Sequence, residues 1–307
     1  MKLPSTLAPD EAVIIVPELA APLQTWLSTQ TECVLVQRAE PPRQWCRLPE
    51  GRPSAAVLRW LGEEVPMPAA DWCVGLDPVF LQANQRDVFL ANWPLADLTE
   101  TEGAALADSV RAHLVGDSDP RIATAMLVAA SSSRWYLAGR GAAPAADQTA
   151  PAELARQVPL RNFPPAGSEA KLVRRLATEL QMLLHTHPAN TARAASGRQP
   201  VNGVWWWGIG VLESTPAPSV AVPPLATDAP GWCGLWRWLN GTLVGRDRLA
   251  TGGVVSAPDQ PLQVLEKLLP AVALGDLTTV WIIAKDGVLL VRRPSGWRRL
   301  WQRVFGR

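Results

Sequence analysis

Short continuous apolar runs alternate along the chain with segments in which apolar residues recur at helical spacing, and this alternation predicts an α/β fold. The run Val13–Val16 is continuous rather than alternating, as is typical of a strand buried on both faces of a parallel sheet. Further strands of this sheet are predicted at residues 33–37, 251–255, 278–284 and 288–291. Lys285-Asp286-Gly287 separates the last two strands, and an Asp-Gly turn between apolar runs indicates a hairpin.

The middle of the chain predicts a smaller α+β subdomain. Thr99 and Glu102 form a capping-box pattern for a helix that ends near Leu114. Additional elements are a helical piece at 54–61, a strand at 87–91, and a strand pair at 123–129 and 134–138. Asp71–Val79 is expected to be irregular, and 139–165 to be a linker. We therefore expect residues 1–80 and 200–307 to form the α/β core, and 81–199 to form an inserted subdomain with its linker and connecting helix.

The stretch that follows the strongest helical stripe is polar. The helix is predicted over Ser168–Leu184, with Ser168 as its N-cap, and Pro188 is expected to end helical structure. A polar loop then leads to the aromatic strand Val204–Trp207, which ends in glycines. A helix end, a polar loop and a strand end commonly form one wall of a pocket in α/β proteins.

Composition narrows the class of protein. The formal net charge of the 307-residue chain is +1, which argues against nucleic acid as a partner because no strong global field exists. Its four cysteines include no C-x-x-C pair, so neither a zinc knuckle nor a disulfide framework is predicted. The N-terminal apolar run is too short and acidic for a signal peptide, and no run reaches membrane-spanning length. We therefore expect a soluble cytoplasmic protein.

Metal and nucleophile signals are weak. His185 and His187 are two residues apart, so they cannot share one helix face, and no neighbouring carboxylate completes a metal site. The alternative is a helix-terminal histidine hydrogen-bonded to the turn at 188–190. There is no G-x-S-x-G elbow, and Gly208-x-Gly210 lacks the third glycine of a phosphate loop. No metal and no cofactor is predicted.

Two segments carry basic side chains with open roles. Arg193 and Arg198, beside Asn190 and Asn202, suit either the binding of an anion or the satisfaction of buried backbone carbonyls. At the C-terminus a stripe of apolar residues faces arginines at helical spacing, which suits an anionic membrane, a partner's groove, or docking on the protein's own core. The docking candidates are Trp297, Arg298, Arg299, Trp301 and Arg303.

The order HP-x-N-x-x-R-x-x-x-G-x-x-P-x-N-x-x-W-x-W-G-x-G, from His187 to Gly210, resembles a segment of the archaeal-type cofactor-independent phosphoglycerate mutases of the alkaline phosphatase superfamily. The chain is more similar still to the bacterial RpfE-type regulatory proteins, through 76–81, 134–137, 180–185 and the aromatic strand. The resemblance implies an alkaline-phosphatase-like core sheet flanked by helices and interrupted by a small α+β domain.

The same resemblance shows where the chain departs from the enzymes. Glu18 stands near the place where the mutases have a metal-binding Asp, no Ser nucleophile can be assigned, and no His follows His187. Because two-metal phosphoryl transfer needs several carboxylate and imidazole ligands, we predict a non-catalytic regulatory or scaffold protein. Its partner would be an unknown protein or a small phosphorylated metabolite. The ligand-binding candidates are His185, His187, Asn190, Arg193, Asn202 and Trp207. The alternative is an active mutase or phosphatase with a displaced metal site.

Overall fold

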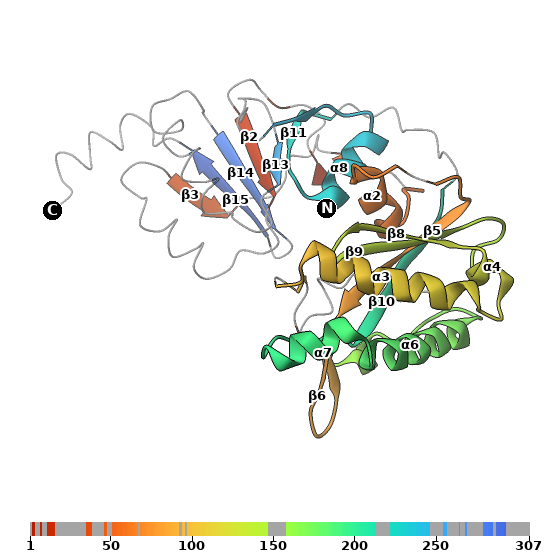
Figure 1. Ribbon diagram of the computed structural model, residues 1–307. Helices are drawn as coiled ribbons and strands as arrows, with labels where there is room; N and C mark the ends of the chain where they lie inside the picture. Colours follow the sequence, from red (N-terminus) through yellow and green to blue (C-terminus); the bar gives the residue numbers. More distant parts are fainter. Residues whose placement is uncertain are drawn as a thin grey trace, which may run out of the picture. The chain divides into compact units, whose positions relative to one another are not determined.

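The computed structural model describes residues 2–3, 7, 11–15, 35–38, 46–47, 51–66, 68–91, 94–95, 97–146, 158–212, 222–245, 254–256, 264, 268, 279–284 and 287–292. The chain divides into two compact units (Figure 1). The first combines Met1–Arg52 with Pro216–Arg307, and the second is the continuous segment Pro53–Thr215. Both units contain helix and strand, which confirms the mixed α/β class.

The first unit is built on a seven-stranded sheet in the order β12-β11-β13-β2-β14-β15-β3 (Figure 1). Its strands are β2 Glu11–Ile15, β3 Leu35–Arg38, β11 Leu225–Ala226, β12 Leu243–Val244, β13 Val254–Ser256, β14 Thr279–Ala284 and β15 Gly287–Arg292. Strand β2 pairs in parallel with β13 and β14, and Ala12–Ile15 are buried. The continuous apolar run thus forms a central parallel strand, as predicted.

Antiparallel pairs complete this unit. Strand β14 pairs with β15, which confirms the hairpin, although Lys285 and Asp286 in its turn lie outside the described residues. The short strands β1 Lys2–Leu3 and β4 Cys46–Arg47 form a separate pair. Helix α8, Pro230–Trp238, buries Trp236, whose Nε1 donates to the carbonyl of Pro223 at 2.8 Å.

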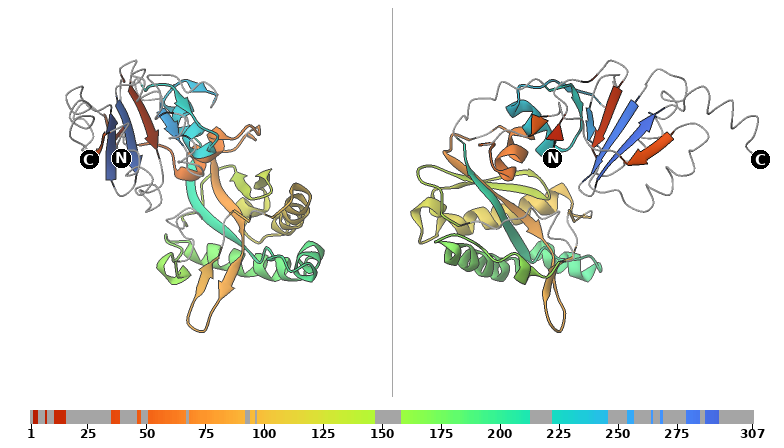
Figure 2. Two further views of the ribbon diagram at one scale, coloured as in Figure 1. Left: turned by 90° about the vertical axis from the view of Figure 1, so that its left-hand side faces the viewer. Right: turned by 180° about the vertical axis from the view of Figure 1, so that it is seen from behind.

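The second unit contains an antiparallel sheet in the order β10-β5-β9-β8 (Figure 2). The strands of this sheet are β5 Trp72–Val79, β8 Met126–Ser131, β9 Arg134–Gly139 and β10 Gly203–Val211. Strands β6 Leu81–Ala83 and β7 Val88–Leu90 form a separate hairpin. The helices are α2 Ala55–Gly62, α3 Glu100–Val115, α4 Pro120–Ala123, α6 Ala170–His185 and α7 Pro188–Ala195, with a 3-10 turn, η1, at Leu160–Asn162.

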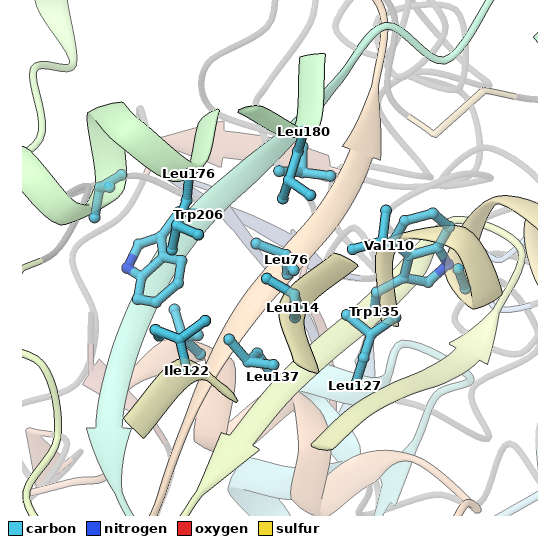
Figure 3. Close-up of a cluster of buried hydrophobic side chains, with 14 of the residues drawn as sticks. Leu76, Val110, Leu114, Ile122, Leu127, Trp135, Leu137, Leu176, Leu180 and Trp206 are labelled. Atoms are coloured by element: carbon cyan, nitrogen blue, oxygen red, sulfur yellow. The ribbon is translucent and has the colours of Figure 1, made fainter. Parts of the chain in front are cut away.

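Helices cover both faces of this sheet, so its central strand β5 is buried along its whole length. Alternate residues point to opposite faces. Trp72, Val74 and Leu76 join the core formed with α3 and α6, whereas Cys73 packs with Val57 and Trp60 of α2. Figure 3 shows Leu76 in this core beside Leu114 of α3 and Leu180 of α6. The segment 71–79, which we expected to be irregular, is therefore a strand. Its glycine, aspartate and proline disfavour strands in isolation, but burial between two helical layers outweighs that preference.

Local signals place the helix ends. Thr99 accepts from the backbone of Glu102 at 3.2 Å and Glu102 accepts from the backbone of Thr99 at 3.1 Å, which confirms the capping box. The N-cap of α6 is Glu169 rather than Ser168, and it makes no side-chain cap. Instead its carboxylate pairs with Arg121 at 2.6 Å, so an ion pair outside the helix replaces the predicted cap.

The boundaries between the units differ from those expected at 80/81 and 199/200. Strands β5 and β10 pair with each other from Trp72 to Val79, and β5 also pairs with β9. Both strands therefore belong to the sheet of the second unit, and the division falls at 52/53 and 215/216.

Candidate functional site

The stretch from His185 to Gly210 is more helical than its sequence suggested. Helix α6 ends at His185, and Pro188 begins α7 two residues after Thr186. Proline suits the first position of a helix, where its missing amide hydrogen costs nothing. The Nδ1 atom of His187 accepts from the amide of Ala189 at 3.1 Å and caps α7. The expected polar loop is therefore largely a second helix.

The two asparagines of this stretch bind backbone. Buried Asn190 donates to the carbonyls of Leu184 and Val201 at 2.7 and 2.6 Å, and accepts from the amide of Val201 at 2.8 Å. Asn202 accepts from the amide of Leu81 at 2.7 Å and donates to its carbonyl at 2.8 Å. Asn190 thus joins the end of α6 to Val201, just before the aromatic strand, and Asn202 joins the same segment to the distant Leu81, so the amide groups of both are used within the fold.

Arg193 is completely buried, and its guanidinium binds carboxylates and carbonyls of the protein. It donates to Asp97 Oδ1 at 2.7 Å, to Glu102 Oε2 at 2.9 Å and to the Gln199 carbonyl at 2.8 Å. Arg198 also pairs with Glu102, at 2.7 Å. Of the two roles left open by the sequence, the contacts of Arg193 agree with the satisfaction of internal acceptors.

The electrostatics of this cluster depend on Glu102. Partial burial alone would raise the pKa of its carboxyl, but hydrogen bonds from Thr99 and Arg198 and the charge of Arg193 outweigh it and lower the pKa to about 2. Glu102 therefore remains ionised at any ordinary pH. It links the N-terminus of α3 to α7 and the loop after it.

The three histidines of the sequence lie in the second unit and have separate surroundings. His187 Nε2 is 3.0 Å from Ser109 Oγ, and because Nδ1 accepts the cap, the proton of the neutral ring belongs on Nε2. His113 Nε2 is 3.3 Å from Glu179 Oε2. His185 is exposed at the end of α6. The imidazole of His187 thus has both nitrogens in use, and the three rings do not form a ligand set.

Trp207 lies in a different environment from the other five predicted residues. Its Nε1 donates to Asp77 Oδ2 at 2.9 Å, and its ring lies 4.6 Å from the guanidinium carbon of Arg59. Arg59 donates to both oxygens of Asp77, at 2.8 and 2.6 Å, and the backbone of Trp135 donates to Asp77 at 3.3 Å. Asp77 and Arg59 are buried, so this is an ion pair inside the protein.

The buried network continues to the end of α2. Arg59 Nε donates to the Tyr136 hydroxyl at 2.7 Å, and that hydroxyl donates to Glu63 Oε1 at 2.8 Å. Arg134 also donates to Glu63, at 2.8 and 3.1 Å. Burial raises the pKa of Tyr136, so its hydroxyl keeps the proton that it donates. Sequence reasoning missed this network because its members lie in four separate segments.

The glycines after Trp207 allow α2 to approach β10. Gly208 has a φ of +66°, and a Cβ on it would lie 2.9 Å from the amide nitrogen of Ala56. At Gly210 a Cβ would lie 2.4 Å from Ser54 Oγ. Ser54 in turn donates to the carbonyl of Gly208 at 2.5 Å and caps α2. These glycines therefore serve helix packing.

A cleft of about 310 Å³ lies between α6, β10 and η1. Its floor consists of six buried side chains: Leu76, Val173, Leu176, Val204, Trp205 and Trp206. Half-buried Leu81, Leu160 and Pro165 form its walls, and exposed Arg174, Ala177 and Thr178 form its rim. None of the six predicted ligand-binding residues lines it. The sequence predicted α6 from its apolar stripe but gave no sign of the cleft, because the lining residues come from segments that are distant in sequence.

A wider hollow of about 700 Å³ lies at the start of α6 and is lined by charged side chains. Arg121 pairs there with Asp119 and Glu169, and Arg175 pairs with Asp117 at 2.8 Å. The hydrogen bonds from these arginines lower the pKa values of both aspartates. The two arginines are neutralised by carboxylates of the protein, which weakens the case for an anion in this hollow.

The remaining sequence candidates can be placed only in part. Within the described part of the chain, no group of three or more His, Cys, Asp or Glu side chains is arranged to hold a metal ion. Glu18, Asp286 and the C-terminal docking candidates Trp297, Arg298, Arg299, Trp301 and Arg303 lie outside the described residues. No helix among the residues described is both long enough and apolar enough to cross a membrane.

Comparison with known proteins finds matches among solved structures only. No family model and no curated protein matches the chain. It is similar to a cofactor-independent phosphoglycerate mutase from Thermoplasma acidophilum DSM 1728, at 15% identity and a TM-score of 0.40, over 94% of this chain and 90% of that chain. It is also similar to the PH0037 protein from Pyrococcus horikoshii, at 13% identity and a TM-score of 0.43, over 94% and 88% of the two chains. The mutase activity named here belongs to the Thermoplasma acidophilum protein and is not assigned to this chain.

Proposed function

We propose that this chain is a non-catalytic regulatory or scaffold protein of RpfE type, built on an alkaline-phosphatase-like framework. The observation that carries the proposal is the use of its histidines. His187 caps α7 through one ring nitrogen and contacts Ser109 through the other, and His113 contacts Glu179. A two-metal phosphoryl-transfer site needs several imidazole and carboxylate ligands around one point, and these side chains serve helix ends and surface pairs instead.

The polar residues of the mutase-like segment support the same proposal. Asn190, Arg193 and Asn202 bind backbone groups and carboxylates within the second unit. Binding a phosphorylated substrate through Arg193 would require its buried guanidinium to leave Asp97 and Glu102, which costs free energy because these carboxylates compensate its charge inside the protein. A segment of this kind therefore stabilises the fold, and a regulatory function would act through the surfaces of the molecule.

Turnover assays test the proposal. The purified full chain is incubated with 3-phosphoglycerate, and separately with p-nitrophenyl phosphate, in the presence of manganese and in the presence of a chelator. We expect no difference in rate between the two conditions. Manganese-dependent turnover would favour the alternative, an active mutase or phosphatase with a displaced metal site.

A variant separates such turnover from a contaminating phosphatase. Because Glu18 stands near the metal-binding position of the mutases, Glu18→Gln should abolish any turnover that belongs to the chain. Lys2→Gln, which removes a charge far from that position in the sequence, serves as the matched control.

A further inference from the structure

We propose that the cleft between α6, β10 and η1 binds a small molecule with an apolar body and one anionic group, such as a medium-chain carboxylate. The cleft shares the strand residues Val204, Trp205 and Trp206 with the mutase-like segment but none of that segment's polar ligand-binding candidates, and the proposal holds whether or not the chain is catalytic. Three properties of the cleft carry it: its volume, its lining and the charge on its rim.

The volume is too large for a packing defect. Protein interiors contain few voids larger than a water molecule, whose share of liquid volume is about 30 Å³. The cleft encloses about 310 Å³ and reaches the core residues Leu76 and Leu176, which are 1% and 2% exposed. Pockets for small molecules begin at about 300 Å³. The cleft therefore has the size of a small ligand site.

The lining favours an apolar body. The residues of the floor are aliphatic apart from Trp205 and Trp206. Trp206 Nε1 already donates to the carbonyl of Ala146 at 3.2 Å, so its ring offers carbon surface rather than a donor. The rim hydroxyl of Thr178 donates to the backbone of Arg174 at 3.0 Å. Little remains in the lining to bind a polar or sugar-like ligand.

The charge on the rim selects an anion. Arg174 is exposed at the mouth, and among the residues that the structure describes no acidic side chain lines the cleft. Among the described residues no carboxylate pairs with Arg174, whereas the next residue, Arg175, pairs with Asp117 and Glu179. A guanidinium over an apolar floor can form two parallel hydrogen bonds with a carboxylate while the chain of the ligand enters the cleft. An apolar cation would instead meet like charge.

The first experiment is a calorimetric titration of the full chain with octanoate, butanoate and octylammonium. We expect saturable binding of octanoate with one site. Butanoate should bind at least tenfold more weakly, because each methylene removed costs up to about fourfold in affinity. Octylammonium, which has the same alkyl chain and the opposite charge, should also bind at least tenfold more weakly. Failure of octanoate to bind, or equal binding of octylammonium, would overturn the proposal.

Variants of exposed residues then locate the site. Arg174→Gln should weaken octanoate about 5- to 13-fold, from the upper value for an exposed ion pair to the lower value for a hydrogen bond to a charged group. Lys171→Gln is the matched control, because it removes the same charge from the exposed surface of the same helix outside the cleft, and it should leave affinity unchanged. Ala177→Trp should fill the cleft and abolish binding while the thermal midpoint stays within about 2 °C, since Ala177 is exposed.

Two results of the variant series would also overturn the proposal. Octanoate binding that survives Ala177→Trp with unchanged affinity would put the ligand elsewhere on the chain. If another segment of this chain fills the cleft, octanoate will not bind, and Ala177→Trp will lower the thermal midpoint by displacing that segment. Ala177→Leu, with a smaller side chain, repeats the test should the tryptophan variant fail to fold.

Discussion

Replacing Asp77 with asparagine removes the negative charge from the buried network of the second unit. The carboxylate accepts hydrogen bonds from Arg59, Trp207 and the backbone of Trp135, at distances between 2.6 and 3.3 Å. Both charged partners are almost completely shielded from water, with side-chain exposures of 5% for Arg59 and 0% for Asp77. The asparagine keeps the shape of the side chain, but it presents an NH₂ group to donors and no charge to the guanidinium.

The expected loss of stability follows from this burial. Removing one partner of a buried ion pair typically lowers the free energy of unfolding by about 3–5 kcal/mol, because the remaining charge loses its compensation. A domain is stable by about 5–15 kcal/mol in total, so the Asp77→Asn variant should fold but unfold at much lower urea concentration. Adding Arg59→Met removes the second charge and should recover part of the loss. That recovery would measure the coupling within the pair.

Urea unfolding of the full chain, followed by tryptophan fluorescence, measures these differences. Asp87→Asn is the matched control, because Asp87 pairs with Arg161 at the surface of the same unit, where the side chains of Arg161 and Asp87 are 66% and 13% exposed. An exposed pair contributes about 1 kcal/mol or less. If Asp77→Asn costs no more than Asp87→Asn, the reasoning that burial determines the strength of the Asp77 pair is refuted.

Three further predictions use other sites in the second unit. The pKa of Glu102 is lowered from 4.5 to about 2 in the folded chain, so its contribution to stability is present above pH 4.5 and is lost as the pH falls toward 2. The difference in urea midpoint between the wild type and Glu102→Gln should therefore shrink across that window. The control variant Glu100→Gln should change the urea midpoint little. Thr99→Ala should cost about 1 kcal/mol in urea unfolding through loss of the capping box, and Thr101→Ala, an exposed position in the first turn of the same helix, should cost less. Burial raises the pKa of the Cys73 thiol, so a chain with Cys73 as its only cysteine should react with a thiol reagent in urea and remain unreacted when native.

Elements with strong local signals were predictable from the sequence. The capping box at Thr99 and the apolar run at Val13 each correspond to the predicted element. The strand at 71–79 was not predictable from the sequence, because Gly75, Asp77 and Pro78 are residues that strands disfavour. Each has a tertiary reason to be there. A Cβ at Gly75 would lie 2.4 Å from Trp207 Nε1, Asp77 pairs with Arg59, and the paired register with β9 ends before Pro78.

The candidate site shows a similar division. The sequence correctly singled out the stretch after α6 as polar and ordered, but its side chains bind the protein itself, and this depends on partners such as Asp97 and Leu81 from distant segments. The alternative of a helix-terminal histidine hydrogen-bonded to the turn at 188–190 is confirmed by His187, whose Nδ1 accepts from the amide of Ala189. That this turn begins a second helix, with His187 as its N-cap, was not predicted, because imidazole is not among the side chains that usually cap helices. The cleft could not be predicted, since Leu160 and Trp206 come together only in the fold.

The division of the chain into units also sets an order of events on the ribosome. The second unit is one continuous segment, so all of its strands have been synthesised once residue 215 has been made. Strand β2, made among the first residues, pairs with β13 and β14, which are translated near the end. Domains generally fold as units during synthesis. The second unit can therefore fold while the apolar run at Val13 is still unpaired, because β13 and β14 have not yet been translated. In a cell, that delay exposes an aggregation-prone β segment, and nascent chains stalled before residue 254 should depend on chaperones to stay in solution.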